Sequence, residues 1–257
     1  MLLAIKNLSI HVSTHIEKKV IVDDVSFNVG EKRVVALVGG SGSGKTTIGL
    51  SILGLLSPEL RVTKGAIFFK KRNLRSLPEG AMRILRGKEI GMVFQEPLNA
   101  FNPVFRIGNQ IDEVLQYHLD LSSKQRKARV LELLDIVGMK EPKIMAKAYP
   151  HQLSGGMRQR AMIAQAIAGN PSLLIADEPT SNLDVTLQAR IMDLFKELKD
   201  KINLSVLLIT HDLGVVQHLA DDVVVMKEGQ VVESGMTESI LTKPGHEYTK
   251  KLMEAIN

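Results

Sequence analysis

Apolar and polar residues alternate over the first thirty positions of the chain, in the spacing of short β-strands. The apolar positions here are Leu3, Ile5, Leu8, Ile10, Val20, Val22, Val25, Phe27 and Val29. The next run, Val34–Val38, is apolar throughout, which is typical of a strand buried on both faces. A glycine-rich segment and an expected helix over residues 46–56 follow it. A strand, a glycine-rich loop and a helix in this order indicate the start of a parallel α/β sheet.

Between positions 97 and 167 the apolar residues recur at intervals of three and four, which is the period of an amphipathic helix. Residues 107–119 and 130–137 each predict a helix, and Gly138 is expected to end the second one. Residues 155–168 predict a third helix. This part of the chain is therefore expected to be a helical insertion.

Strand character returns on both sides of the insertion. The expected strands lie at residues 66–69, 90–94, 173–176, 206–209 and 223–226, and turns at 227–229 and 234–235 are expected to bracket one more. The sequence thus predicts a single α/β domain over residues 1–257. It would have a parallel-sheet core, an N-terminal antiparallel β subdomain and a helical subdomain inserted at about 97–167.

The composition is that of one folded domain, with 257 residues of which 44% are hydrophobic and 24% charged. The net charge of +5 comes with only 4% aromatic residues, so we expect a mildly basic surface and no nucleic-acid partner. The lack of cysteine excludes disulfides and thiolate metal sites. No apolar run reaches the ~20 residues of a membrane span, and no signal peptide is indicated, so a cytosolic chain is expected.

The segment after the fully apolar strand fits the phosphate-binding pattern G-x-x-x-x-G-K-[ST]. It consists of Gly39, Gly40, Ser41, Gly42, Ser43, Gly44, Lys45, Thr46 and Thr47. Small residues let backbone N–H groups surround phosphate oxygens, and Lys45 would add a positive charge at the β- and γ-phosphates. The Thr46 hydroxyl is expected to bind Mg²⁺, and the start of the next helix favours an anion. The segment indicates a nucleotide site.

Three further strand ends carry candidate chemistry. Asp177 and Glu178 end an apolar run; the first is expected to hold Mg²⁺ and the second to polarise the attacking water. An isolated Asp-Glu pair can equally be a solvated turn, but beside a phosphate loop the catalytic interpretation is favoured. His211 and Gln95 each follow a strand, where a histidine is more often structural and a glutamine can simply cap the strand.

A second glycine-rich segment resembles the signature of the ATP-binding cassette (ABC) family. It consists of Leu153, Ser154, Gly155, Gly156 and Met157. Other elements of the family pattern occur in the family's order: the glutamine loop at Gln95, the acidic pair, the D-loop at Ser181, Asn182, Leu183 and Asp184, and the switch histidine at His211. The resemblance covers almost the whole chain and implies a P-loop NTPase fold that hydrolyses ATP with Mg²⁺.

The resemblance also implies a role for each residue. Glu178 would activate water, His211 would sense the γ-phosphate, and Gln95 would contact Mg²⁺ and link the site to the helical insertion. The signature would bind the ATP of a second ATPase subunit in a head-to-tail dimer. The aromatic residue on which the family stacks adenine is missing, because its place holds His15 or Ile16. The expectation that the nucleotide is ATP rather than GTP therefore rests on the family resemblance.

A finer resemblance connects the chain to the peptide/nickel branch of importer ATPases. It is carried by residues 94–103, 149–160 and 244–250. That branch implies a second ATPase subunit, two membrane permeases and an extracytoplasmic solute-binding protein as partners, with the chain peripheral at the cytoplasmic face of the membrane. Longer members carry a C-terminal cysteine cluster that this sequence lacks, and this favours nickel or a metal chelate slightly over di- or oligopeptides.

Two other classes stay open. A non-transport ABC ATPase in assembly or regulation would copurify without permeases. A plain phosphate-loop kinase would act as a monomer and would not respond to a change of Ser154.

Overall fold

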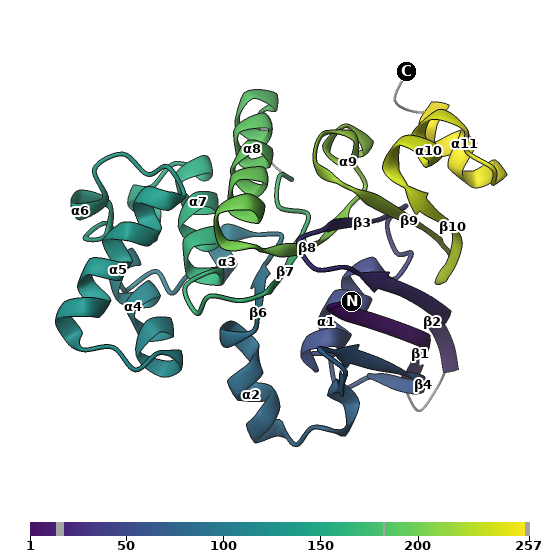
Figure 1. Cartoon of the computed structure of the whole chain (residues 1–257), viewed down its shortest axis with the longest axis horizontal. Coiled ribbons are helices and arrows are strands. Elements are labelled where there is room, and N and C mark those ends of the chain that lie inside the picture. Colours follow the sequence, from purple (N-terminus) through teal and green to yellow (C-terminus); the bar gives the residue numbers. More distant parts are fainter. Residues whose placement is uncertain (14–17, 182, 255–257) are drawn as a thin grey trace.

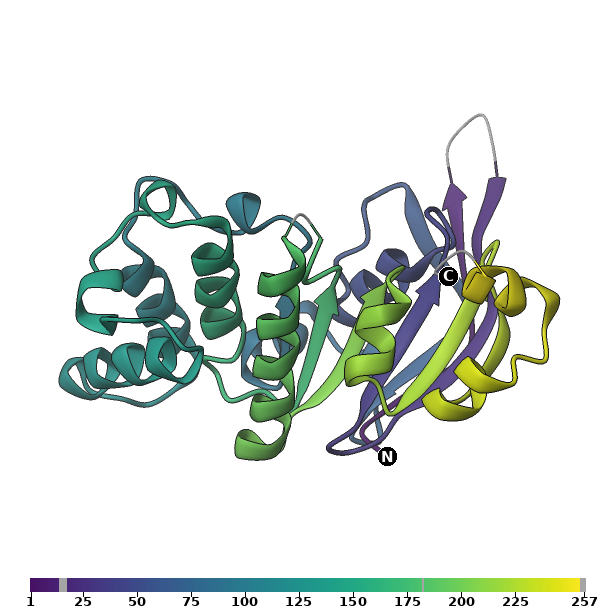
Figure 2. The same ribbon diagram turned by 90° about the horizontal axis from the view of Figure 1, so that it is seen from above.

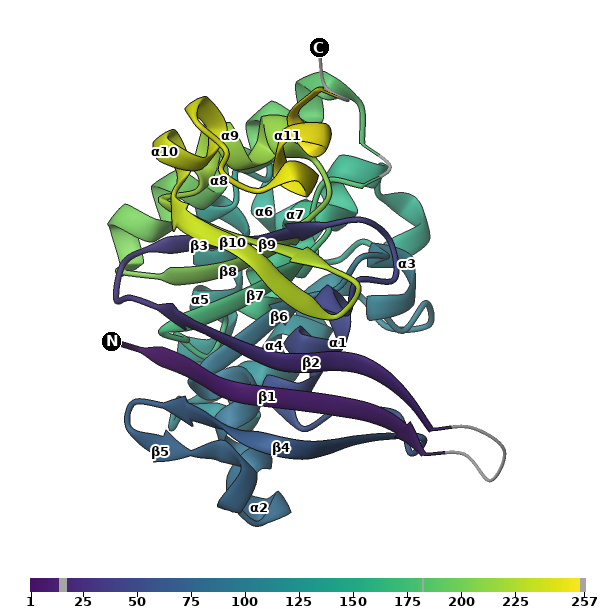
Figure 3. The same ribbon diagram turned by 90° about the vertical axis from the view of Figure 1, so that its right-hand side faces the viewer.

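Two β-sheets with one helix between them form the centre of the molecule (Figure 3). The computed structural model describes residues 1–13, 18–181 and 183–254. The first sheet is antiparallel, in the order β2-β1-β4-β5; its strands are β1 Leu3–Ser13, β2 Lys18–Val29, β4 Leu60–Phe69 and β5 Arg72–Asn73. The alternating pattern predicted strands here, and the N-terminal antiparallel β subdomain of the expected fold is confirmed.

The second sheet has the order β10-β9-β3-β8-β7-β6 and is parallel except for the β9–β10 pair. Its strands are β3 Val34–Gly39, β6 Ile90–Val93, β7 Leu173–Asp177, β8 Ser205–Thr210, β9 Asp222–Lys227 and β10 Gln230–Met236. Helix α1 (Lys45–Leu53) packs between the two sheets through Ile48, Ile52 and Leu53.

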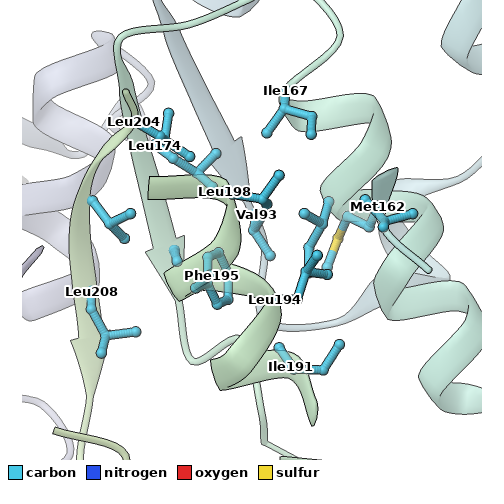
Figure 4. Packing of buried hydrophobic residues seen from close by; sticks show 14 of the residues in the cluster. Val93, Met162, Ile167, Leu174, Ile191, Leu194, Phe195, Leu198, Leu204 and Leu208 are labelled. Atoms are coloured by element: carbon cyan, nitrogen blue, oxygen red, sulfur yellow. The ribbon is translucent and has the colours of Figure 1, made fainter. Parts of the chain in front are cut away.

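The parallel strands are buried on both faces, as the fully apolar run of residues 34–38 indicated. Val35 and Leu37 of β3 belong to the core between the sheets, whereas Ala36 belongs to a second core on the opposite face. Helix α8 (Val185–Ile202) covers that opposite face with Phe195 as a fully buried side chain. Figure 4 shows this second core, in which residues of α8 meet residues of the strands and of the helix of the signature segment. A polar residue on either face of these strands would lose its contact with water.

Helices in the region 97–166 gather at one end of the molecule, beyond α8 (Figures 1 and 2). They are α3 Pro97–Ala100, α4 Ile107–His118, α5 Ser123–Ile136, α6 Pro142–Met145 and α7 Gly155–Ala166. Helix α7 contacts α3, α4 and α5 as well as β6, so it joins this helical group to the sheet.

The remaining helices complete the surface. They are α2 Glu79–Lys88, α9 Leu213–Leu219, α10 Thr237–Thr242 and α11 Glu247–Glu254, with short 3₁₀ turns at Leu74–Ser76 and Pro150–Gln152. Helices α10 and α11 lie beside the β9–β10 edge of the second, mostly parallel sheet, which is called the central sheet below (Figure 3).

Three local predictions differ from the structure. Helix α1 ends at Leu53 rather than at 56, because Gly54 adopts a left-handed conformation with φ 64° and closes the helix. Strand β4 begins at Leu60 rather than at 66, because β1 continues far enough to pair with it. The predicted turn at 234–235 is wrong: both residues pair with β9, and the missing side chain of Gly235 leaves room for the side chain of Ile240 from α10.

Candidate functional site

The predicted site residues meet at the carboxyl ends of the parallel strands. The phosphate loop follows β3, Asp177 ends β7, and His211 follows β8. Gln95 comes two residues after β6. Parallel strands place their carboxyl ends on one edge of the sheet, and this is the edge where α/β proteins bind ligands.

The phosphate loop depends on glycine at two positions. A Cβ on Gly39 would lie 2.2 Å from the carbonyl oxygen of Met226 on β9, so a side chain there would displace backbone. Gly44 has φ 95°, and a Cβ there would lie 2.9 Å from the carbonyl oxygen of Ile21. The loop is thus held against β9 on one side and β2 on the other.

Lys45 is folded back into the phosphate loop. Its Nζ donates hydrogen bonds to the carbonyl oxygens of Gly39 at 2.8 Å and Gly40 at 3.0 Å, and lies 3.4 Å from the Ser43 hydroxyl. The residue is only 7% exposed. Burial lowers the pKa of Lys45, and the neighbouring carboxylates Glu178 and Asp177 oppose that shift. The loop therefore keeps a nearly buried ammonium group bonded to its own carbonyl oxygens.

Asp177 and Thr46 form an oxygen-rich corner beside Lys45. The Thr46 hydroxyl lies 3.1 Å from Asp177 Oδ1. Burial raises the pKa of Asp177, and the hydrogen bond from Thr46 acts against that shift. A hard divalent cation prefers such hydroxyl and carboxylate oxygens, so these donors fit Mg²⁺.

Gln95 lines the same cleft as these two residues. The cleft has a volume of about 600 Å³ and is lined by Leu50, Met92, Phe94, Glu96 and Ala100 in addition to Thr46, Asp177 and Gln95. Gln95 is exposed at its mouth, and α3 begins directly beyond it. The glutamine therefore lies between the helical group and the oxygen-rich corner formed by Asp177 and Thr46, which is called the cation corner below.

Glu178 is paired with His211 across the strand ends. Nδ1 of His211 lies 2.7 Å from Glu178 Oε1. Glu178 adopts the left-handed conformation with φ 47°, which is uncommon for a side chain of this type. Its backbone N–H donates to Ile209 and its carbonyl accepts from the Ser181 hydroxyl, so the strained residue is held from both sides. The histidine is 63% exposed, which leaves its other ring nitrogen open to a ligand.

The signature segment opens helix α7. Ser154 is its N-cap, and the hydroxyl accepts a hydrogen bond from the N–H of Met157 at 3.3 Å. Gly156 faces α8, where a Cβ would lie 3.1 Å from the Leu187 side chain. Leu153 is buried, whereas Ser154 and Gly155 are exposed. Helix α7 and helix α1 are held by different elements, so one chain presents two separate glycine-rich helix starts.

The D-loop residues link Glu178 to helix α8. Asp184 is the N-cap of α8 and accepts from the N–H of Leu187 at 2.9 Å. Leu183 packs on the second core. Asn182 lies outside the described residues, as do the adenine-stacking candidates His15 and Ile16.

Two side chains at the site carried no predicted role. The Gln159 amide donates to the carbonyl of Pro179 at 2.6 Å inside the core, which connects the signature helix to the loop just after Glu178. The Tyr248 hydroxyl contacts the N–H of Gly40 in the phosphate loop. Both lie in segments that carry the finer resemblance, at 149–160 and 244–250, and Gln159 also falls on the buried side of its helix; neither signal pointed to these contacts.

This arrangement of a phosphate loop, a lysine and a strand-end acidic pair defines a phosphate-loop nucleotide-binding protein of the α/β class. Comparison with known proteins makes this more specific. Residues 22–181 match the family described as ABC transporter. The chain belongs to this family, which confirms the resemblance noted in the sequence.

Curated relatives match nearly the full chain. It is 48% identical over 99% of its length to the peptidoglycan transport ATP-binding protein YejF of Agrobacterium fabrum. It is 47% identical to the oligopeptide transport protein AppD of Bacillus subtilis and 45% identical to the dipeptide transport protein DppD of Haemophilus influenzae, again over 99%. The chain spans 47% of the first relative and 78% and 77% of the other two.

Solved structures confirm the fold. A dimeric structure of the cassette MJ0796 bound to ADP and Pi has a TM-score of 0.82 at 28% identity, covering 92% of this chain and 99% of the other. CbiO1 of Clostridium perfringens, part of the transporter complex CbiONQ, has a TM-score of 0.81 at 25% identity, covering 100% and 94%. Among the described helices, none is long and apolar enough to cross a membrane.

Proposed function

We propose that the chain is the ATP-hydrolysing subunit of an ABC importer for di- or oligopeptides, bound at the cytoplasmic face of a membrane. The observation that carries this proposal is the 45–47% identity, over 99% of the chain, to ATP-binding proteins named for peptide transport. Residues 1–257 would act as one ATPase unit, with the helical group at about 97–167 as its inserted subdomain. The proposal takes peptides over nickel, because the relatives described above are named for peptides or peptidoglycan.

The site residues suggest how ATP would be cleaved. Lys45 would exchange its carbonyl partners for β- and γ-phosphate oxygens and stabilise the charge that develops there. Glu178 would accept a hydrogen bond from the attacking water, and His211 would hold the carboxylate while its second nitrogen faces the γ-phosphate. Thr46, Asp177 and Gln95 would hold Mg²⁺, which neutralises phosphate charge when bound.

A complete site requires a second ATPase subunit. The phosphate loop and the signature lie at the starts of separate helices of one chain, and each would offer half of the ATP site. Head-to-tail pairing would bring the Ser154 end of one subunit to the ATP held by Lys45 of the other. The dimeric cassette structure that contains ADP and Pi supports this arrangement.

A change of Ser154 to arginine tests the pairing. The large charged side chain at the exposed start of α7 should leave the Kd for ATP within about twofold while lowering hydrolysis by about 100-fold or more, since a lost transition-state contact of ~3 kcal/mol has that effect. The matched control is Ser122→Arg, which alters another exposed serine N-cap. In mixed dimers Ser154→Arg should regain one working site with a Lys45→Ala subunit. Unchanged hydrolysis by the Ser154 variant would exclude a role in trans.

The helical group is the proposed contact with the permeases. A groove between α4, α5 and α6 is lined by apolar Val130 and Leu131, by the four cationic side chains Arg106, Lys127, Lys143 and Lys147, and by one acidic side chain, Asp112. Such a groove suits a permease segment with apolar and acidic side chains. Gln95 lies between the cation corner and this helical group, and would connect hydrolysis to transport.

The first test is copurification. Tagged Glu178→Gln protein, expressed in its native host and extracted in detergent with ATP, should bring down two permeases, an ATPase partner and a peptide-loaded solute-binding protein. Mass spectrometry would identify each partner and the ligand. A nickel-loaded binding protein would correct the cargo, and recovery of only water-soluble partners would favour the non-transport alternative.

A further inference from the structure

Tyr248, on helix α11, joins the C-terminal part of the described chain to the phosphate loop. The backbone N–H of Gly40 donates a hydrogen bond of 3.0 Å to the Tyr248 hydroxyl, although the two residues are 208 positions apart. A Cβ on Gly40 would lie 3.3 Å from the hydroxyl oxygen. This is tighter than ordinary van der Waals contact, so glycine suits the close approach.

Both backbone polar groups of Gly40, the N–H and the carbonyl, are hydrogen-bonded. Its carbonyl oxygen accepts from Lys45 Nζ at 3.0 Å and from the N–H of Ser43 at 3.3 Å. Its N–H is bonded to Tyr248. The first bend of the phosphate loop is therefore fixed by the phosphate-binding lysine on one side and by the tail on the other.

The segment that carries Tyr248 is itself anchored. The Glu233 carboxylate on β10 accepts from the N–H groups of Gly245 at 2.7 Å and His246 at 3.1 Å. Nδ1 of His246 in turn accepts from the N–H of Tyr248 at 3.0 Å. The ammonium group of Lys227 lies over the tyrosine ring, 5.6 Å from its centroid. The hydroxyl is thus presented to Gly40 from a segment with few ways to move.

Binding of ATP changes the balance at the bend. The Lys45 ammonium has three N–H donors, which face the Gly39 and Gly40 carbonyl oxygens and the Ser43 hydroxyl, so each donor given to a phosphate oxygen weakens this set of loop contacts. The hydrogen bonds that Gly40 makes with the N–H of Ser43 and with the Tyr248 hydroxyl do not involve the lysine. We propose that Tyr248 is a positioning residue for ATP, whose hydroxyl keeps this bend in its phosphate-binding shape when the lysine turns to the nucleotide. The proposal rests on the phosphate loop being the nucleotide site, as proposed above.

The test replaces only the hydroxyl, with Tyr248→Phe in the full chain, and measures the Kd for ATP with Mg²⁺ by isothermal titration calorimetry. A neutral hydrogen bond contributes enough to predict a Kd about 3- to 10-fold higher than that of the wild-type protein. The KM for ATP should rise by the same factor, with kcat changed less than about twofold. Tyr117→Phe is the matched control, because Tyr117 is an exposed tyrosine on α4.

A second variant keeps the tyrosine and loosens its anchor. Glu233→Gln weakens the clamp on Gly245 and His246, and should raise the Kd for ATP in the same direction but less. A Kd for Tyr248→Phe no different from that for Tyr117→Phe would overturn the inference. So would a lowered melting temperature of the nucleotide-free protein with an unchanged Kd, since Tyr248 would then only hold the tail. Wild-type protein that binds no ATP would instead remove the nucleotide-site assignment and this inference with it.

Discussion

Replacement of Glu178 by glutamine is expected to lower kcat for ATP hydrolysis by about 100- to 10,000-fold, the range for loss of a positioned general base. Glutamine has nearly the same shape, so the backbone bonds to Ile209 and Ser181 should persist. The Kd for ATP should stay within about threefold. Single-turnover hydrolysis of radiolabelled ATP measures the rate of the chemical step, and equilibrium binding of ATP measures the Kd, so the two effects are separated.

The matched control is Glu228→Gln. Glu228 is also a glutamate in the left-handed conformation, with φ 49°, but it lies in the β9–β10 turn. The same change of charge at the same backbone conformation should leave kcat near the wild-type value. Near-normal turnover by Glu178→Gln would show that another group activates the water, and His211, 2.7 Å from the carboxylate, would be the next residue to change.

Removal of the Lys45 ammonium is the second large effect, and Lys45→Ala is expected to weaken ATP binding by about 100-fold or more. A hydrogen bond to a charged group contributes about 1.5–3 kcal/mol, and this lysine would supply bonds to two phosphates. Its loss also removes a cation that stands beside two carboxylates, so the phosphate charge would face them uncompensated. Titration calorimetry with ATP and Mg²⁺ gives the Kd directly.

Lys201→Ala provides the control for Lys45→Ala. Lys201 is an exposed residue on α8 whose ion pair among the described residues is with Glu197, four residues earlier, so its removal should not change the Kd for ATP. Circular dichroism would establish that both variants are folded. Retained ATP affinity in folded Lys45→Ala protein would remove the assignment of the phosphate loop as the nucleotide site.

Much of the fold follows from local sequence patterns. The fully apolar run at 34–38 predicted a strand buried on both faces, the alternating residues before it predicted short strands, and both exist. Helix α8 received no prediction, although Ile191, Leu194 and Leu198 have helical spacing and are buried. The turn expected at 234–235 failed for a tertiary reason, because a small residue there makes room for Ile240 rather than for a bend.

In the site, too, local motifs predicted some features, whereas others depend on tertiary contacts. Motifs placed Lys45, Asp177 and His211 at strand ends because each motif is local and the strands are parallel. The inward fold of Lys45 and the pairing of Glu178 with His211 depend on distances between separate strands, which no motif contains. The contact of Tyr248 with Gly40 depends on β9 pairing beside β3 and on β10 directing the tail back, so only the assembled sheet reveals it.

The two outer strands of the central sheet bear on how copies of this chain can associate. An edge strand exposes unpaired N–H and C=O groups to which a strand of another molecule can add, which leads to aggregation. Here one edge is β6, only four residues long, and the other is β10, whose register shifts between Val231 and Glu233. A short edge and an irregular edge are both poor templates for strand addition. The sheet therefore disfavours growth by addition of strands from another molecule at its sides.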